Sequence, residues 1–372
     1  MTDFIKGADI STLKEVRECG GIFYNKEGIE TDLLTLLKNY DFNYVRLRLW
    51  NNPYGDNGEK YGAGNNDFET LLELSKECKA AGFKILLDFH YSDFWADPGK
   101  QYPPKAWADF NLMQLEKAVY DFTKDTLDKL EAENVYPDMV QVGNELSNGF
   151  LWPIGKWPNF DNIALLVSSG IKAVKECNKR YNHTSKIMIH LDNGGNNKLY
   201  REWFDNYLER GEDFDIIGLS YYPFWHGTLN DLNYNMTDIA KRYNKDLVIA
   251  EVSMGFSMED YSSYEGLSPD ERKGYATRQE LVDKLDYEMT EEGQAKFTQD
   301  FLNLLTSIDN NKGKGFFWWE AGWIPVKGSG WATDASLAYI KEKGPCGNEW
   351  ANQALFTYDG HPLKALDVIK EF

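Results

Sequence analysis

The feature that most constrains the fold of this chain is a regular alternation of short apolar runs with longer amphipathic stretches. A short apolar run that ends in polar residues is typical of a strand buried in a parallel sheet. Such runs occupy residues 6–10, 44–50, 84–90, 139–145, 186–192, 215–222, 246–252 and 315–320. Helical patterns lie between them, for example at residues 31–39, 67–81, 112–133, 161–180, 231–243 and 291–308. Eight such units predict an α/β fold, a (β/α)8 TIM barrel.

The helix expected at residues 67–81 has recognisable ends. Asn66 stands at the N-cap position and Glu69 follows three residues later, which is the spacing of a capping box. Gly82 follows the last residue of the pattern and is a typical C-terminal stop. The sequence therefore predicts a helix with Asn66 as its N-cap.

Charge and composition exclude several classes of protein. The chain carries 40 Lys and Arg against 59 Asp and Glu, a net charge of −19, which disfavours nucleic acid because Lys and Arg bind its phosphates. No stretch approaches twenty consecutive apolar residues, so no membrane span is expected. No linker rich in Gly, Ser or Pro divides the sequence. We therefore predict a single domain over residues 1–372, and a monomer.

The sequence leaves the cellular compartment open. The N-terminus, MTDFIKGADIS, has neither the basic nor the apolar region of a signal peptide. We expect a cytoplasmic protein if Met1 is the native start and a secreted one if a signal peptide has been removed. The cysteines are far apart and form no C-x-x-C pair, which favours a reducing compartment; they are Cys19, Cys78, Cys177 and Cys346.

Polar or aromatic side chains end almost every predicted strand. In a TIM barrel these ends surround one mouth, where active sites are built. Glu145 ends the fourth predicted strand and Glu251 the seventh. Each glutamate alone could be a salt-bridge partner. As a pair on strands 4 and 7, they predict the two carboxyl groups of a glycoside hydrolase.

Tryptophans gather at the same strand ends: Trp50, Trp95, Trp152, Trp225, Trp318, Trp319, Trp323 and Trp331. Sugars present C–H faces for stacking and hydroxyl groups for hydrogen bonds, so a polysaccharide groove combines aromatic rings with acids and amides. Trp318 and Trp319 are adjacent on one strand and face opposite sides, so at most one enters the barrel mouth.

Motifs for competing chemistries are missing from the sequence. It contains no G-x-x-x-x-G-K-[ST] for phosphate, no G-x-G-x-x-G after a strand and no G-x-S-x-G. Its five histidines form neither H-x-H nor H-E-x-x-H, so no metal site is expected. His90 and His226 lie in aromatic clusters, and we interpret them as hydrogen-bond donors to substrate, with structural histidines as the alternative.

Together these motifs resemble those of glycoside hydrolase family 53, the endo-β-1,4-galactanases. The resemblance covers essentially the whole chain, through YVRLRLWNNPYG, GAGNNDFE, LLDFHYSDFWADPGKQYPPKAW, DMVQVGNE, LSYYPFWHGTL and FFWWEAGWIPV. It implies a TIM barrel of glycoside hydrolase clan A that cleaves β-1,4-galactan, the side chains of type I arabinogalactan and pectin, with retention. It also implies that no cofactor is required and that the partner is galactan or galacto-oligosaccharides.

The resemblance further implies roles for individual residues. Glu145 would be the general acid/base and Glu251 the nucleophile. Arg46 would order the nucleophile, and Asn144 would contact the sugar 2-hydroxyl. The other implied substrate contacts are polar residues and stacking platforms around the cleaved sugar: His90, Asp192, Tyr221, Trp95, Trp225 and Trp319.

Some bacterial members of the family bind calcium through an Asp/Asn-rich stretch after strand 7, but that ligand loop is not recognisable here. The corresponding stretch, MEDYSSYEGLS within residues 253–290, lacks alternating oxygen ligands.

The alternative functions are another clan A endo-glycanase, such as a mannanase or xylanase, and a barrel that binds carbohydrate without cleaving it.

Overall fold

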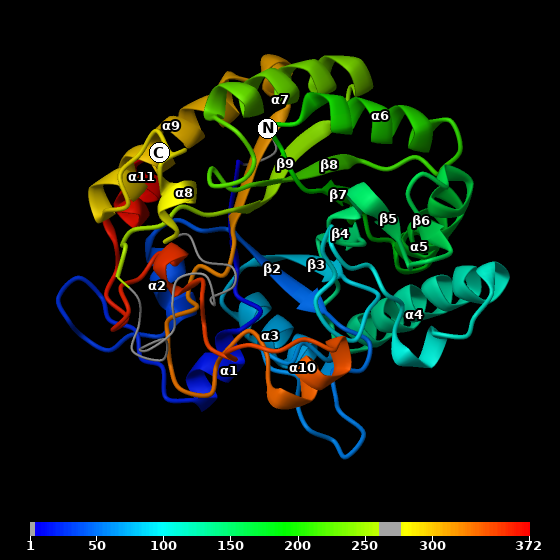
Figure 1. The fold of residues 1–372 in the computed structure, drawn as a ribbon, viewed down its shortest axis with the longest axis horizontal. Coiled ribbons are helices and arrows are strands. Elements are labelled where there is room, and N and C mark those ends of the chain that lie inside the picture. The colour runs from blue at the N-terminus through cyan, green and yellow to red at the C-terminus, as the bar shows by residue number, and fades with distance from the viewer. Residues whose placement is uncertain (1–3, 260–276) are drawn as a thin grey trace.

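The computed structural model describes residues 4–259 and 277–372 and confirms the predicted barrel (Figure 1). Eight parallel strands close into one sheet in the order β1-β10-β9-β8-β7-β4-β3-β2. Their bounds are Ile5–Asp9 (β1), Tyr44–Leu49 (β2), Lys84–Phe89 (β3), Met139–Val142 (β4), Lys186–Leu191 (β7), Ile216–Tyr221 (β8), Asp246–Val252 (β9) and Gly313–Trp318 (β10). A short antiparallel hairpin follows β4 and consists of Gly149–Phe150 (β5) and Gly155–Lys156 (β6).

Helices surround the barrel, as Figure 1 shows. Each of the longer ones buries an apolar stripe against the strands. The helices are Leu13–Glu18 (α1), Leu33–Asn39 (α2), Phe68–Ala80 (α3), Leu112–Ala132 (α4), Phe160–Tyr181 (α5), Asn197–Leu208 (α6), Leu229–Tyr243 (α7), Gln279–Val282 (α8), Glu291–Ser307 (α9), Asp334–Ile340 (α10) and Lys364–Glu371 (α11).

The predicted N-cap of α3 is wrong by one residue. Asp67, not Asn66, is the N-cap, and its carboxylate accepts a hydrogen bond of 2.8 Å from the backbone N–H of Thr70. The Asn66 side chain instead donates to the carbonyl of Ala63 at 2.6 Å. Because both residue types cap helices well, their order in the sequence does not reveal which one is used.

The interior of the barrel is a packed apolar plug below the mouth. Leu86, Met139, Met188, Val248 and Phe317 belong to this cluster and are almost fully buried. The larger second cluster includes the apolar faces of the surrounding helices and the strand residues that point towards them. The plug closes the barrel from below, so polar side chains near the C-terminal strand ends face only the mouth.

A β-bulge on β9 decides where Glu251 points. Val248 and Ala250 both face the barrel interior, so strict alternation would turn Glu251 outward. The pairing with β8 skips one residue at this position, from Leu219 opposite Ile249 to Ser220 opposite Glu251. Such a bulge re-aims the following side chain, and it returns Glu251 to the mouth.

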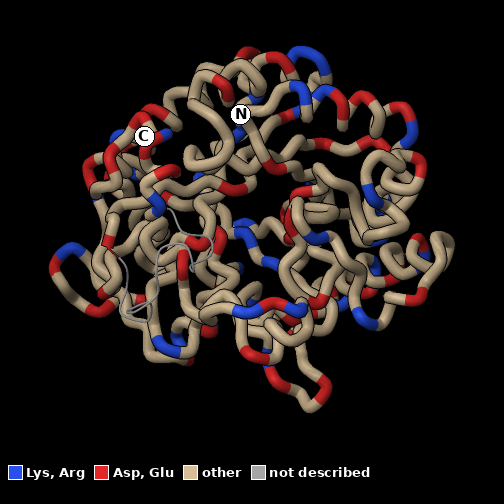
Figure 2. Tube along the Cα trace, in the orientation of Figure 1, with Lys and Arg blue, Asp and Glu red and all other residues tan. Residues whose placement is uncertain are grey.

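Charged residues are spread over the outside of the molecule. Figure 2 shows Asp and Glu along the outer helices and loops, with Lys and Arg interspersed among them. Many of these form exposed ion pairs, such as Lys117 with Asp121 on α4 and Arg242 with Asp205 between α7 and α6. Within the described residues, every helix is too short or too polar to cross a membrane.

Candidate active site

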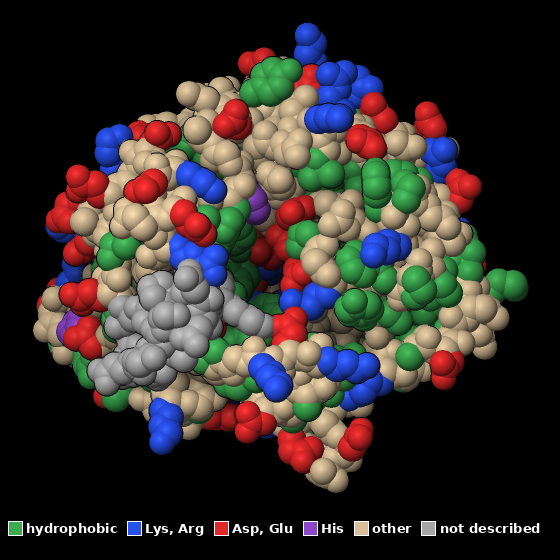
Figure 3. Space-filling model, viewed as in Figure 1, with side chains coloured by type: hydrophobic (Ala, Val, Ile, Leu, Met, Phe, Trp, Pro, Cys, Tyr) green, Lys and Arg blue, Asp and Glu red, His purple; other side chains and the backbone are tan. Residues whose placement is uncertain are grey.

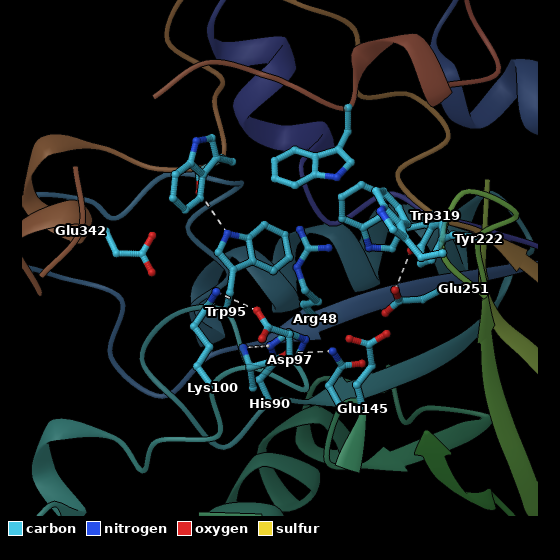
Figure 4. Close-up of a pocket in the computed structure, with 15 residues that line it drawn as sticks. Arg48, His90, Trp95, Asp97, Lys100, Glu145, Tyr222, Glu251, Trp319 and Glu342 are labelled. Atoms are coloured by element: carbon cyan, nitrogen blue, oxygen red, sulfur yellow. Dashed lines mark hydrogen bonds and ion pairs between the residues drawn. The ribbon is translucent and has the colours of Figure 1, made fainter. Parts of the chain in front are cut away.

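A pocket of about 280 Å³ lies at the C-terminal ends of the strands. It corresponds to the central hollow of Figure 3, where acidic side chains lie deep inside. Figure 4 shows its side chains converging from several different strands and loops. The lining residues are Arg48, His90, Trp95, Ala96, Asp97, Lys100, Asn144, Glu145, Tyr222, Trp225, Glu251, Trp319, Trp331, Glu342 and Trp350.

The structure brings Glu145 and Glu251 together in this pocket. Glu145 follows β4 in a left-handed backbone conformation (φ 50°, ψ 58°), and Glu251 lies on β9. Their carboxyl groups face each other in Figure 4, with oxygens of the two groups within 4.8 Å. Retaining glycosidases hold their carboxyl groups about 5–5.5 Å apart, and inverting ones leave about 6.5–9.5 Å for a water. The spacing suits a nucleophile and a proton donor acting on one bond.

Glu251 is held by a cation and a phenol. The Arg46 guanidinium lies 3.0 Å from one carboxylate oxygen, and the Tyr222 hydroxyl donates to the other at 2.7 Å. Arg46 is itself fully buried and pairs with Asp9 at 2.9 Å and with Asp88 at 2.8 Å. Burial raises the pKa of Glu251, while Arg46 and Tyr222 oppose that rise by favouring the ionised form.

Glu145 lies in a different environment. Its hydrogen bond comes from the neutral hydroxyl of Ser220 at 2.6 Å. Burial, and then the negative charges of Glu251 and Asp192, raise its pKa well above the ordinary value. Because Arg46 favours a charge on Glu251, the proton shared by the pair resides on Glu145. The two carboxyl groups therefore differ in protonation, as an acid and a nucleophile must.

A buried network fixes Asn144 beside Glu145. The Asn144 carbonyl oxygen accepts from Arg46 at 2.9 Å and from Gln141 at 3.1 Å, and Nδ1 of His190 lies 2.9 Å from it. Its amide nitrogen donates to the carbonyl of Ala96 at 2.9 Å. An amide nitrogen carries two hydrogens, so one N–H remains for a ligand in the pocket that Asn144 lines.

His90 lines the pocket, but its nitrogens are already used by the protein. Nε2 donates to Asp88 at 3.0 Å, and Nδ1 accepts from the Trp50 indole and the Ala96 backbone, each at 3.2 Å. Burial lowers the pKa of His90, so the ring is neutral. These bonds favour the structural alternative over a hydrogen bond to substrate.

Three other predicted substrate contacts lie outside the lining of the pocket. Tyr221 is fully buried, and its hydroxyl donates to the carbonyl of Gly227 at 3.0 Å. Asp192 accepts a hydrogen bond from Ser147. Nδ1 of His226 lies 3.1 Å from the carbonyl oxygen of Ser220 and 3.2 Å from the backbone nitrogen of Tyr222, so this histidine supports the loop that carries Tyr222.

The predicted stacking residues Trp95, Trp225 and Trp319 all line the pocket. The rings of Trp95 and Trp319 lie 6.2 Å apart, and Trp225 is 42% exposed at the rim. Trp318 points out of the barrel, where its indole donates to the carbonyl of Gln353 at 2.9 Å. The expectation that only one of the two adjacent tryptophans enters the mouth is confirmed.

Several lining residues were not predicted as site residues. Arg48 reaches the pocket from β2, pairs with Glu320 at 2.6 Å and lies over the Trp95 ring at 4.4 Å. Its position at the end of a predicted strand could have identified Arg48 as a pocket residue. Tyr222, which directly follows β8, is another. The rest come from loops, where no periodic pattern marks an inward side chain; they are Ala96, Asp97, Lys100, Trp331, Glu342 and Trp350.

One set of acidic and histidine side chains in the described part of the chain could surround a metal ion. Glu145, His190 and Glu251 place ligand atoms within 4.8 Å of one another. Both nitrogens of His190 are engaged, Nδ1 with Asn144 and Nε2 with Ser220 at 2.8 Å. This arrangement suits a hydrogen-bonded network. The stretch considered for calcium lies almost entirely within residues 260–276, outside the described residues.

The hydrogen bond from Tyr222 to Glu251 leads to a first prediction. We expect Tyr222→Phe to lower kcat/KM by about ten- to hundredfold, because a hydrogen bond to a charged group contributes about 1.5–3 kcal/mol. Its loss also raises the pKa of Glu251, so the acid limb of the pH profile moves to higher pH. Tyr221→Phe removes a hydroxyl outside the pocket and is the matched control. An acid limb that stays in place in Tyr222→Phe would contradict this assignment.

Known proteins share this fold and this sequence pattern. The model of Glycosyl hydrolase family 53 matches residues 5–369. The chain is 36% identical to the endo-beta-1,4-galactanase of Bacillus subtilis (strain 168), covering 99% of this chain and 86% of that protein. It is 32% identical to the arabinogalactan endo-beta-1,4-galactanase of Humicola insolens over 98% of each. The family 53 catalytic domain of Ignisphaera aggregans superposes with a TM-score of 0.88 at 39% identity, covering 99% and 96% of the two chains. The chain belongs to glycosyl hydrolase family 53.

Proposed function

We propose that this protein is an endo-acting, retaining galactanase that hydrolyses β-1,4-galactosidic bonds in galactan and type I arabinogalactan. The observation that carries the proposal is the pair of carboxyl groups within 4.8 Å at the barrel mouth. Glu145 would be the acid/base and Glu251 the nucleophile. The names of the Bacillus and Humicola relatives support the choice of galactan.

The first chemical step forms a covalent intermediate. Glu145 donates its proton to the glycosidic oxygen while the Glu251 carboxylate attacks the anomeric carbon. The bond between that carbon and the leaving oxygen breaks, and the leaving chain departs as an alcohol. Arg46 and Tyr222 hold Glu251 in one orientation, so that little reorganisation is needed at the moment of attack.

The second step returns the free enzyme. Glu145, now ionised, removes a proton from a water molecule, whose oxygen attacks the anomeric carbon from the side that the leaving group vacated. The bond to Glu251 breaks, and the sugar leaves with its original β configuration. Ionised Glu145 and Glu251 repel each other across 4.8 Å or less, which favours return of the proton to Glu145 at the end of the cycle.

The pocket offers a neutral sugar both stacking and hydrogen bonds. The rings of Trp95, Trp225 and Trp319 supply apolar surface, and the spare N–H of Asn144 lies beside Glu145. In clan A enzymes an amide at this place would meet the 2-hydroxyl of the sugar being cleaved. A neutral galactan needs no cationic groove, so the acidic surface does not oppose binding.

Digestion of potato galactan tests this function. We expect a spread of intermediate oligosaccharides at early times, because an endo-acting enzyme cuts within the chain, and β-configured ends in the first products by NMR. Mannan and xylan are the comparison substrates, and Glu251→Gln is the inactive control. Preferential cleavage of mannan or xylan, or binding of galactan without cleavage, would contradict the proposal.

A further inference from the structure

We infer that an exposed aromatic surface beside the pocket binds the leaving-group portion of the galactan chain; this inference rests on the proposed function. The surface, named here the rim platform, consists of Tyr102, Trp152 and Trp157. Tyr102 is 60% exposed and Trp157 is 45% exposed, whereas Trp152 is buried. Figure 3 shows hydrophobic side chains gathered over the β5 and β6 region, next to the central hollow.

The rim platform is built rigidly. Tyr102 packs edge-on against Trp152 with ring centroids 5.7 Å apart, and the Lys156 ammonium lies 4.3 Å from the centre of the Trp152 ring. The Trp152 indole N–H and the Trp157 backbone N–H both donate to the carbonyl of Asn148, at 2.9 and 3.0 Å. The Tyr102 ring and the backbone that carries Trp157 are thereby fixed before any ligand arrives, which lowers the entropy cost of binding.

The rim platform is continuous with the catalytic pocket. Lys100 lines the pocket, and Tyr102 follows two residues later. Between them, the Gln101 amide donates to the carbonyl of Asn144 at 2.6 Å, and the backbone N–H of Trp152 donates to the carbonyl of Gln101 at 2.6 Å. A single residue, Gln101, therefore connects the aromatic surface to the segment that carries Glu145.

The position of the rim platform indicates which part of the substrate it binds. Glu145 protonates the leaving oxygen, so the leaving chain departs on the side of the segment that follows β4, and that segment carries Trp152 and Trp157. Exposed aromatic faces suit the C–H faces of neutral pyranose rings, and stacking of this kind needs no charge on the ligand. The rim platform therefore binds leaving-group galactosyl units beyond the one next to the cleaved bond.

The test compares substrates of different length. In the double variant Tyr102→Ala/Trp157→Ala we expect kcat/KM on galactan to fall about tenfold, because one stacked aromatic contact contributes a factor of roughly two to ten. An aryl β-galactobioside has no sugar on the leaving-group side, so its kcat/KM should stay within about twofold. Tyr234→Ala removes a 63% exposed tyrosine from α7 and is the matched control. Galactan affinity measured in a Glu251→Gln background should weaken by a similar factor in the double variant.

Each other outcome has a distinct meaning. Equal losses on galactan and on the aryl substrate would indicate a disturbed pocket and would overturn the inference, as would a double variant that behaves like Tyr234→Ala. Sedimentation that reveals a dimer dissolved by Trp157→Ala, with unchanged galactan kinetics, would assign the surface to a second copy of the chain. Wild-type protein that leaves galactan intact would overturn the proposed function itself, and the inference with it.

Discussion

Replacing Glu251 by alanine is expected to lower kcat on galactan by a factor on the order of 10⁴ or more, since the variant lacks the carboxylate proposed to attack the anomeric carbon. Arg46 stays bound to Asp9 and Asp88, so the barrel should keep its structure. Hydrolysis of galactan and of an activated aryl β-galactobioside measures the loss. A variant that retains even a hundredth of the wild-type rate would exclude Glu251 as the nucleophile.

Rescue of Glu251→Ala by a small anion such as azide distinguishes loss of the nucleophile from a general loss of activity. Azide can enter the space left by the carboxylate and attack from the same face, so Glu251→Ala should form an α-galactosyl azide from the aryl substrate. Glu15→Gln is the matched control, because Glu15 is a carboxyl outside the pocket whose pKa burial raises to about 7. Glu15→Gln should keep its activity and form no galactosyl azide. A β-configured azide from Glu251→Ala would contradict the assignment.

The number and order of the barrel strands could be predicted from the sequence because strands buried on both faces leave continuous apolar runs. The two glutamates followed from the same pattern, since each comes at the end of such a run. Their separation did not follow, because the orientation of Glu251 depends on the bulge between β8 and β9. A single extra residue in a strand leaves no mark in the hydrophobic pattern, although it reverses every side chain after it.

The choice between Tyr221 and Tyr222 shows the same limit. Both follow an apolar strand, and neighbouring side chains point to opposite faces. Ser220 hydrogen-bonds Glu145 inside the mouth, so its alternate neighbour Tyr222 also points inward, while Tyr221 packs against Phe297 on the outside. The resemblance selected the wrong member of the pair for contact with the pocket. Which alternate residues of a strand face inward is determined by the elements that pack against it, and the local sequence does not contain those elements.

Replacing Glu145 by alanine should separate the two chemical steps. On galactan we expect kcat/KM to fall by about 10²–10⁴, the usual contribution of a general acid. A dinitrophenyl β-galactobioside needs no proton on its leaving group, so its first step should stay fast while hydrolysis of the intermediate becomes slow. The expected result is a burst of dinitrophenol followed by a slow steady state. An equal loss of the first step on both substrates would exclude Glu145 as the acid.

Azide and pH provide two further measurements on Glu145→Ala. Azide should accelerate the steady state and form a β-galactosyl azide, because it attacks the intermediate from the side of the missing carboxylate; this is the opposite configuration to that expected from Glu251→Ala. The pKa of Glu145 is raised, so wild-type kcat/KM falls as pH rises through that pKa, and this alkaline limb should vanish in the variant on the activated substrate.

Stability gives an independent check on the same carboxyl group. In the unfolded chain it ionises near its ordinary pKa of about 4.3, whereas in the folded protein burial keeps it protonated to higher pH. Any stability that this group contributes is present below the unfolded pKa and is lost as pH rises through the folded one. Glu145→Gln should therefore melt at the same temperature as wild type at pH 4 and at a higher temperature at pH 7. A lower melting temperature of Glu145→Gln at pH 7 would show that the ionised carboxylate stabilises the fold, and Glu145 could then not be the residue that keeps the proton.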